Sequence, residues 1–285
     1  MDQVQARCAS AVRRYLVFLL LLLPLTGLAD QPDLVREKMP NGRVALATWH
    51  PGHEDKPPVL ILHGFLQTRE FPTVARLGES LAEEGYPVLL PTLTLGVDTR
   101  RKSLPCEAVH LHSMEQDAEE VAHWVKWLQR RTGKPVTVIG HSAGSSTLLA
   151  LSQRHPELPV SRMILVSLLS FRPEEASVEG KPVPSAGGRL REYRIAFCKR
   201  YPSTPEAFAS YRAWDAKRTL QALADAPWPV SVILGGADDR VTPQWRARLK
   251  ASPAELRVVE EAGHFFDTQY EFDLLDEVMD LLGGA

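Results

Sequence analysis

Two periodicities of apolar residues alternate along the chain and predict strands and helices in turn. Short runs rich in β-branched residues predict buried strands, whereas apolar residues three and four positions apart predict amphipathic helices. The predicted strands are residues 43–49, 59–62, 88–93, 136–139, 163–167, 230–234 and 256–259. The predicted helices are residues 74–84, 114–128, 143–151 and 272–282. This alternation favours an α/β fold whose mainly parallel sheet is covered by helices on both faces.

One segment interrupts the alternation. Residues 171–222 contain prolines, glycines and basic residues, and no strand is predicted within them. We expect this segment to pass over one end of the sheet as a small cap, inserted after the sixth strand, rather than to fold as a separate domain.

The composition is typical of one large globular domain. The chain has 285 residues, of which 44% are hydrophobic, and a formal net charge of −2. This length is sufficient for a substantial core. No basic stripe indicates a nucleic-acid partner. We therefore expect residues 30–285 to form a single domain and the protein to be a monomer.

The first 29 residues are typical of a secretory signal peptide. Three arginines precede the apolar run "YLVFLLLLLPLTGLA", which ends in small residues at Gly27 and Ala29. We expect cleavage after Ala29 and export to the periplasm or the medium. The alternative is an uncleaved anchor, the one route by which we expect contact with a membrane. The run is shorter than the roughly 20 residues that span a bilayer.

A serine between two glycines stands at the junction of a predicted strand and a predicted helix. The motif "GHSAG" places Ser142 directly after residues 136–139 and before residues 143–151. It matches G-x-S-x-G, the nucleophile elbow, whose tight turn lifts the serine hydroxyl above the sheet. Gly140 and Gly144 fit this turn because larger side chains on either side of the serine would collide across it.

Two later strands are followed by residues that can activate a serine. Asp238 and Asp239 follow residues 230–234, and His264 follows residues 256–259. A serine hydroxyl needs a base within hydrogen-bond reach and a third group that orients the base. Because the carboxyl ends of parallel strands meet at one edge of a sheet, we expect these groups to converge on Ser142.

These motifs resemble those of the α/β-hydrolases. The resemblance extends from Val44 to Leu282 and depends on "LILHGF", "GHSAG", "GGADDRVTP" and "EAGHFF". It implies an α/β-hydrolase fold with Ser142 as nucleophile and His264 as base. It implies Asp239 as the acid, because the family pattern places the aspartate three residues after a glycine, here Gly236, and four before a proline. Asp238 is then a solvated loop residue or a supporting group.

The same resemblance implies how the site is completed. The backbone N–H groups of Phe65 and Ala143 would form the oxyanion hole. His63, beside Gly64, would brace that loop by hydrogen bonding, and His141 would pack at the elbow.

Two features place limits on the remaining chemistry. His110 and His112 form an H-x-H pair, but without a further ligand at a known spacing this pair does not indicate a metal. We expect neither a metal nor a cofactor. Residues 92–113, "TLTLGVDTRRKSLPCEAVHLHS", depart from the short turn found in many α/β-hydrolases. This loop and the cap should overhang the serine and set the substrate.

The mature chain retains two cysteines. Cys8 lies in the leader, whereas Cys106 lies in the long loop and Cys198 in the cap. Export to an oxidising compartment permits a disulfide between Cys106 and Cys198, which would fasten the cap to the loop. The alternative is two unpaired, buried thiols.

The expected function is a secreted serine hydrolase that cleaves a carboxylic ester, a small-molecule acyl ester, through an acyl-enzyme on Ser142. Two alternatives with the same triad are a proline-type aminopeptidase and a thioesterase. A further alternative is a non-catalytic binding protein on a hydrolase scaffold, although none of the three triad residues is missing. Dehalogenase chemistry is disfavoured because the elbow carries a serine rather than an aspartate.

Overall fold

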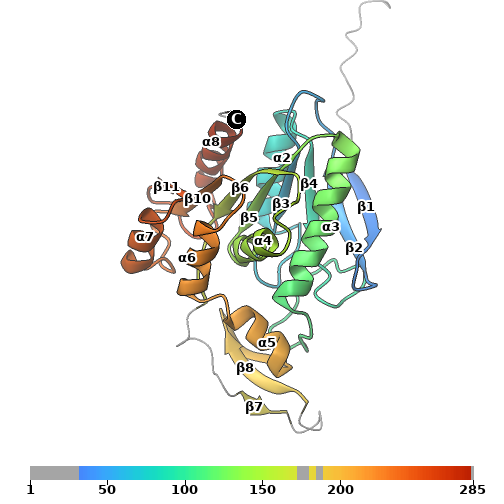
Figure 1. The fold of residues 1–285 in the computed structure, drawn as a ribbon, viewed down its shortest axis with the longest axis vertical. Helices are drawn as coiled ribbons and strands as arrows, with labels where there is room; N and C mark the ends of the chain where they lie inside the picture. Colours follow the sequence, from blue (N-terminus) through green and yellow to red (C-terminus); the bar gives the residue numbers. More distant parts are fainter. Residues whose placement is uncertain (1–31, 172–179, 184–188, 284–285) are drawn as a thin grey trace, which may run out of the picture. The chain divides into compact units, whose positions relative to one another are not determined.

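A central sheet of eight strands organises the chain, in the order β1-β2-β4-β3-β5-β6-β10-β11 (Figure 1). The computed structural model of the protein describes residues 32–171, 180–183 and 189–283, so the leader expected over residues 1–29 lies outside it. The strands are β1 (Asp33–Lys38), β2 (Val44–His50), β3 (Val59–Leu62), β4 (Val88–Thr92), β5 (Val136–His141), β6 (Val160–Val166), β10 (Val230–Gly235) and β11 (Glu255–Val259).

The sheet is parallel from β4 to β11. β4, β3, β5, β6, β10 and β11 pair in parallel with their neighbours, whereas β1 with β2 and β2 with β4 pair antiparallel. The carboxyl ends of the parallel strands therefore meet at one edge, as the sequence predicts. The expected fold class is confirmed.

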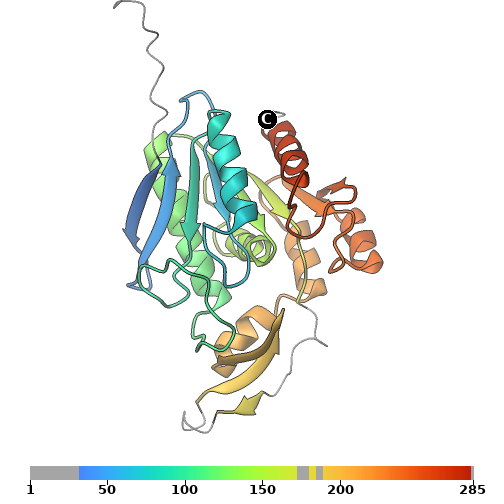
Figure 2. The ribbon, with the colours of Figure 1, turned by 180° about the vertical axis from the view of Figure 1, so that it is seen from behind.

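Helices cover both faces of the sheet and bury a separate apolar core on each (Figures 1 and 2). α2 (Pro72–Glu83) and α8 (Tyr270–Gly283) pack on one face around residues such as Val74 and Val278. α3 (Met114–Thr132), α4 (Ala143–Arg154) and α6 (Ala216–Ala224) contribute to the larger core of the other face. Ser113 and Gln116 form the capping box that begins α3.

Several elements were not predicted from the sequence. β1 is an edge strand whose residues are mostly exposed, so it lacks the apolar run that marks a buried strand. α7 (Pro243–Lys250) buries only Trp245 and Leu249, which leaves too little periodicity to predict a helix. Its capping threonine, Thr242, followed by a proline at the first helical position, is the signal that could have found it.

The cap contradicts the expectation that residues 171–222 contain no strand. It holds β7 (Lys181–Pro182), β8 (Arg191–Ile195) and β9 (Cys198–Ser203), which form a second, antiparallel sheet, followed by α5 (Pro205–Arg212). The basic residues and prolines concealed a short buried face, on which Tyr193 stacks against Phe208 with ring centroids 3.8 Å apart. By its contacts the cap belongs to the same compact unit as the central sheet, Pro32–Ala285.

The cap is joined to the long loop that follows β4. Cys106 and Cys198 form a disulfide, with Cα atoms 5.3 Å apart. The His110 N–H donates to the Pro202 carbonyl at 2.8 Å, and the Ser203 hydroxyl donates to the His110 carbonyl at 2.7 Å. These contacts fix β9 to the loop at two points.

None of the helices in the described part of the chain is long and apolar enough to cross a bilayer.

The disulfide should make a large contribution to stability because it closes a long stretch of chain. The two cysteines are 92 residues apart, for which the chain-entropy estimate is about 4.6 kcal/mol. We expect Cys106→Ser/Cys198→Ser to lower the free energy of unfolding by an amount of this order. Equilibrium urea unfolding measures it, with reduced wild-type protein as the control. A loss below about 1 kcal/mol in both samples would show that the cap is held mainly by its other contacts.

Candidate active site

Ser142 occupies a strained turn between β5 and α4. Its φ of 56° and ψ of −121° are unfavourable for a residue with a side chain. The turn is held by the Ser142 N–H, which donates to the Val166 carbonyl at 2.8 Å. It is also held by the buried Ser145 hydroxyl, which donates to the Gly140 carbonyl at 2.7 Å.

The two glycines of the motif are required by close backbone contacts. A Cβ on Gly140 would lie 2.7 Å from the carbonyl carbon of Gly144, across the turn, as predicted. A Cβ on Gly144 would instead lie 2.6 Å from the carbonyl oxygen of His63, at the end of β3. The second glycine therefore allows α4 to approach the neighbouring strand.

A chain of hydrogen bonds leads from Ser142 to a buried carboxylate. His264 Nε2 lies 2.9 Å from Ser142 Oγ, and His264 Nδ1 lies 2.7 Å from Asp238 Oδ2. An ionised carboxylate only accepts hydrogen bonds, so the His264 proton resides on Nδ1 and Nε2 is left to accept from the serine. His264 is 5% exposed and Asp238 is 4% exposed.

This arrangement corrects the expectation that Asp239 is the partner of His264. Asp239 is exposed and lines the pocket beside the serine, whereas Asp238 turns inward toward the loop after β11. The reason lies in the turn after β10. Asp238 Oδ1 accepts the Arg240 N–H at 3.0 Å, which orients the other carboxylate oxygen toward His264. The glycine to count from is Gly235, the last residue of β10, and not Gly236.

The environment keeps Asp238 ionised. Burial alone would raise the pKa of Asp238, but the hydrogen bond and charge of His264 and the N–H of Arg240 together hold it below its usual value. A carboxylate that stays charged beside an imidazole stabilises the imidazolium form of that ring.

The backbone of His264 is held by two donors. Its carbonyl accepts the Ser167 hydroxyl at 2.8 Å and His141 Nε2 at 3.0 Å. Burial lowers the pKa of His141 to about 4, so this ring is neutral and donates from Nε2. Nothing in the sequence pattern singled out Ser167. Its position directly after β6, at the same sheet edge as Ser142, is the signal that could have found it.

Two backbone N–H groups near Ser142, one in the loop after β3 and one at the start of α4, have no acceptor among the described residues. Phe65 and Ala143 both line the pocket with Ser142, and among the described residues neither backbone N–H has an acceptor. His63 braces this loop because its Nε2 accepts the Leu93 N–H at 3.1 Å and its Nδ1 donates to the Gly64 carbonyl at 2.9 Å. Burial, aided by the charge of Arg100, lowers the pKa of His63 to about 3.

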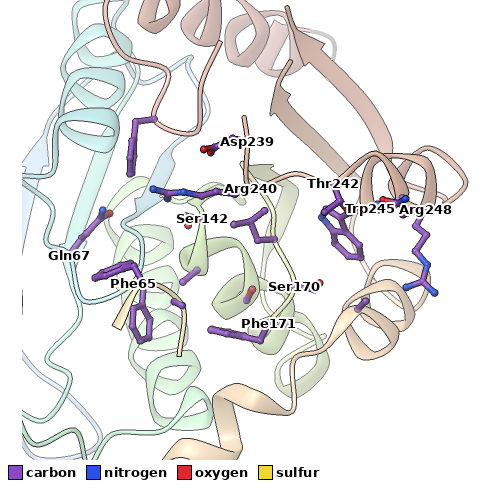
Figure 3. Close-up of a pocket in the computed structure, with 18 residues that line it drawn as sticks. Phe65, Gln67, Ser142, Ser170, Phe171, Asp239, Arg240, Thr242, Trp245 and Arg248 are labelled. Carbon is purple, nitrogen blue, oxygen red and sulfur yellow. Dashed lines mark hydrogen bonds between the residues drawn. The ribbon is translucent and has the colours of Figure 1, made fainter. Parts of the chain in front are cut away.

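A pocket of about 850 Å³ opens beside Ser142. Five aromatic side chains line it: Phe65, Phe171, Phe197, Trp245 and Phe265. Figure 3 shows Ser142 between Phe65 and Phe171 on one side and Asp239 and Arg240 on the other. The cavity is therefore amphipathic, with the serine at the boundary between its apolar and polar parts.

The H-x-H pair of the long loop packs against the cap. His110 is fully buried and stacks on Tyr201 with ring centroids 4.1 Å apart. The Tyr211 hydroxyl donates to Asp117, and His112 Nδ1 lies 2.6 Å from the oxygen of that hydroxyl. Within the described ranges, no group of three or more acidic, histidine or cysteine residues is arranged to hold a metal ion.

Residues 59–272 match the model of the Alpha/beta hydrolase family, which is most of the chain. The chain belongs to this family. No curated protein sequence matches it significantly.

Solved structures show the same hydrolase fold at low sequence identity. Est1E from Butyrivibrio proteoclasticus has 15% identity and a TM-score of 0.64, over 89% of this chain and 99% of that one. The esterase domain of a Rhodothermus marinus protein has 16% identity and a TM-score of 0.60, over 87% and 96%. The thioesterase domain from the curacin biosynthetic pathway has 16% identity and a TM-score of 0.58, over 89% and 99%.

The two neighbouring aspartates provide a matched test of the site. We expect Asp238→Asn to lower the rate at which a fluorophosphonate labels Ser142 by about 10⁴-fold, because asparagine can hold His264 in the wrong tautomer. Asp239→Asn should change this rate less than about threefold, since the Asp239 side chain faces the pocket and the carboxylate bonded to His264 is that of Asp238. Labelling rates measured by intact-protein mass spectrometry decide between them. A larger loss in Asp239→Asn would reject the assignment of Asp238.

Proposed function

We propose that this hydrolase cleaves carboxylic esters through an acyl-enzyme on Ser142. The observation that supports the proposal is the hydrogen-bonded chain Ser142–His264–Asp238 beside a pocket with two free backbone N–H groups. Nucleophile, base and orienting carboxylate are the minimum set for this chemistry. Membership of the family supports a hydrolytic function in general.

Acylation begins when Ser142 Oγ attacks the ester carbonyl carbon and His264 Nε2 takes the hydroxyl proton. The negative charge that develops on the carbonyl oxygen is stabilised by the N–H groups of Phe65 and Ala143. The carbon–oxygen bond to the alcohol then breaks, and the alcohol oxygen takes the proton from His264. Asp238 stabilises the imidazolium between these two proton transfers.

Deacylation repeats the same proton transfers with water. His264 Nε2 takes a proton from the water that attacks the acyl carbon, and Ser142 Oγ leaves with that proton. The products are a carboxylic acid and the free enzyme. The atoms and charges of the reaction therefore balance without a cofactor.

A thioesterase uses the same steps, with a thiolate in place of the alkoxide, and is the second candidate. A thioesterase domain is among the solved structures with this fold. An aminopeptidase is less well supported, because the described residues that line the pocket include two arginines, Arg240 and Arg248, and one carboxylate, that of Asp239. Such a balance disfavours the ammonium group of a peptide substrate.

We also propose that the protein is exported after removal of residues 1–29. The disulfide between Cys106 and Cys198 supports this proposal, since such bonds persist in oxidising compartments. A periplasmic or secreted esterase would meet its substrate outside the cytoplasm.

The proposed nucleophile can be tested directly. We expect Ser142→Ala to remain folded and to lose ester hydrolysis on the order of 10⁶-fold, because the hydroxyl is the attacking group. Hydrolysis of acyl esters and acyl thioesters of matched chain length measures the loss and ranks the two candidate functions. Mass spectrometry of the fluorophosphonate-labelled protein identifies the modified residue and also reports whether the chain starts at Asp30. Wild-type protein that neither labels nor hydrolyses would support a non-catalytic binding role instead.

Phe197 should limit the size of the acyl group. It is 62% exposed at the tip of the β8–β9 hairpin, lines the pocket, and has its ring centroid 5.8 Å from that of Phe65. We expect Phe197→Ala to raise kcat/KM for bulky esters relative to acetyl esters by about tenfold, since a ring is removed from the pocket. Phe272→Ala is the matched control, because Phe272 is equally exposed but lies on α8, outside the pocket lining. An unchanged ratio in Phe197→Ala would place the acyl group elsewhere.

A further inference from the structure

The long loop that follows β4 places a buried arginine beneath the proposed oxyanion loop. Arg100 is only 4% exposed although it belongs to a connection between elements. The residues before it are anchored to the start of β2. The Asp98 carboxylate accepts the Val44 N–H at 2.8 Å, and the Thr99 N–H donates to the Val44 carbonyl at 2.7 Å. The backbone of Arg100 is therefore held in place from the sheet side.

The guanidinium of Arg100 donates hydrogen bonds to backbone carbonyls of two segments, the loop after β3 and the long loop itself. It donates to the carbonyls of Leu66 at 3.3 Å and Gln67 at 2.6 Å, the two residues directly after Phe65. It also donates to the Leu93 carbonyl at 2.8 Å and the Lys102 carbonyl at 3.1 Å. The planar fork of arginine allows one side chain to fix several acceptors at once.

The turn that Arg100 contacts needs such support. Leu66 has a φ of 60°, in the left-handed region, and is 3% exposed. A non-glycine residue held there costs on the order of 1 kcal/mol and persists only where its surroundings hold it. The Leu66 carbonyl accepts from Arg100 and from the Leu104 N–H at 3.0 Å, so both of its donors come from the long loop.

Arg100 remains charged in this setting. Burial lowers the pKa of Arg100 to about 10, while the nearby carboxylates of Asp117 and Glu120 on α3 act in the opposite direction. At neutral pH the side chain is therefore a cation that donates hydrogen bonds and cannot accept them. One of its nitrogens lies 3.4 Å from Nε2 of His63, the residue that braces the other end of the same loop.

We propose that Arg100 is a positioning residue that fixes residues 64–67 so that the Phe65 N–H points to the oxyanion before the substrate binds. The proposal rests on the proposed function, because an oxyanion must form at Ser142. Donors that are already in place stabilise the transition state without reorganisation, and a displacement of about 1 Å can cost on the order of 10²-fold in rate.

The kinetic test compares Arg100→Met with Arg101→Met. Methionine keeps much of the apolar stem but removes every donor, whereas Arg101 is the adjacent, exposed arginine. For Arg100→Met we expect kcat to fall roughly 10²-fold with KM changed less than about threefold, because the loss falls on the transition state. An alkyl boronic acid forms a tetrahedral adduct with the serine. Its inhibition constant should rise in parallel with the fall in kcat. Arg101→Met should match the wild type in all three.

A second variant keeps the test decisive if Arg100→Met does not fold. Arg100→Lys retains the cation but not the fork, so we expect a folded protein with an intermediate loss of kcat and the same unchanged KM. A purely structural role predicts lower unfolding temperatures with kcat of the folded fraction intact. Folded Arg100 variants with wild-type kcat and boronate affinity would overturn the proposal.

Hydrogen exchange separates this proposal from the proposed function. Peptides covering residues 63–69 should exchange faster in Arg100→Lys than in the wild type, and peptides of β5 and α4 should not. This result does not depend on activity, so it can hold even if the wild type fails to hydrolyse esters. Unchanged exchange across residues 63–69 would show that Arg100 does not hold the loop, whatever the enzyme's substrate.

Discussion

The close approach of β3, β5 and α4 is the constraint on which the remainder of the site depends. Gly140 and Gly144 lack a Cβ at the two points where backbone meets backbone, and only then can the chain reverse sharply enough to expose Ser142. The unfavourable φ of Ser142 is stored in this turn and is compensated by the packing of a large parallel sheet. A serine on an unstrained loop would not hold its hydroxyl in the fixed direction that the hydrogen bond to the His264 imidazole requires.

The parallel register of the sheet supplies the other groups at the same edge. β6, β10 and β11 lie side by side beyond β5, so the residues after their carboxyl ends converge on the serine. Ser167 follows β6, Asp238 follows β10, and His264 follows β11. The His264 carbonyl is shared between donors from β5 and from the residue after β6. The position of His264 is thus fixed partly by β5 and by the residue after β6, which lie outside the loop that carries His264.

The part of this site that depends on strand periodicity could be predicted from the sequence. The elbow and His264 follow from a short apolar run and the polar residue after it. Asp238 and Asp239 cannot be separated in this way, because the direction of a side chain in a turn depends on hydrogen bonds such as that from the Arg240 N–H. Arg100 is hidden for a similar reason, since a buried cation in a loop has the same sequence appearance as a solvated one.

In the proposed function, the long loop after β4 would join substrate recognition to catalysis. At Cys106 it is bonded to the cap, one residue from Phe197 at the pocket, and at Arg100 it holds the carbonyls that follow Phe65. Phe65 and Phe197 also contact each other directly. A displacement of the loop would therefore alter the pocket and the position of the Phe65 N–H together. Under the proposed function, this coupling would account for the disulfide and the buried arginine in the loop whose sequence departs from the family pattern.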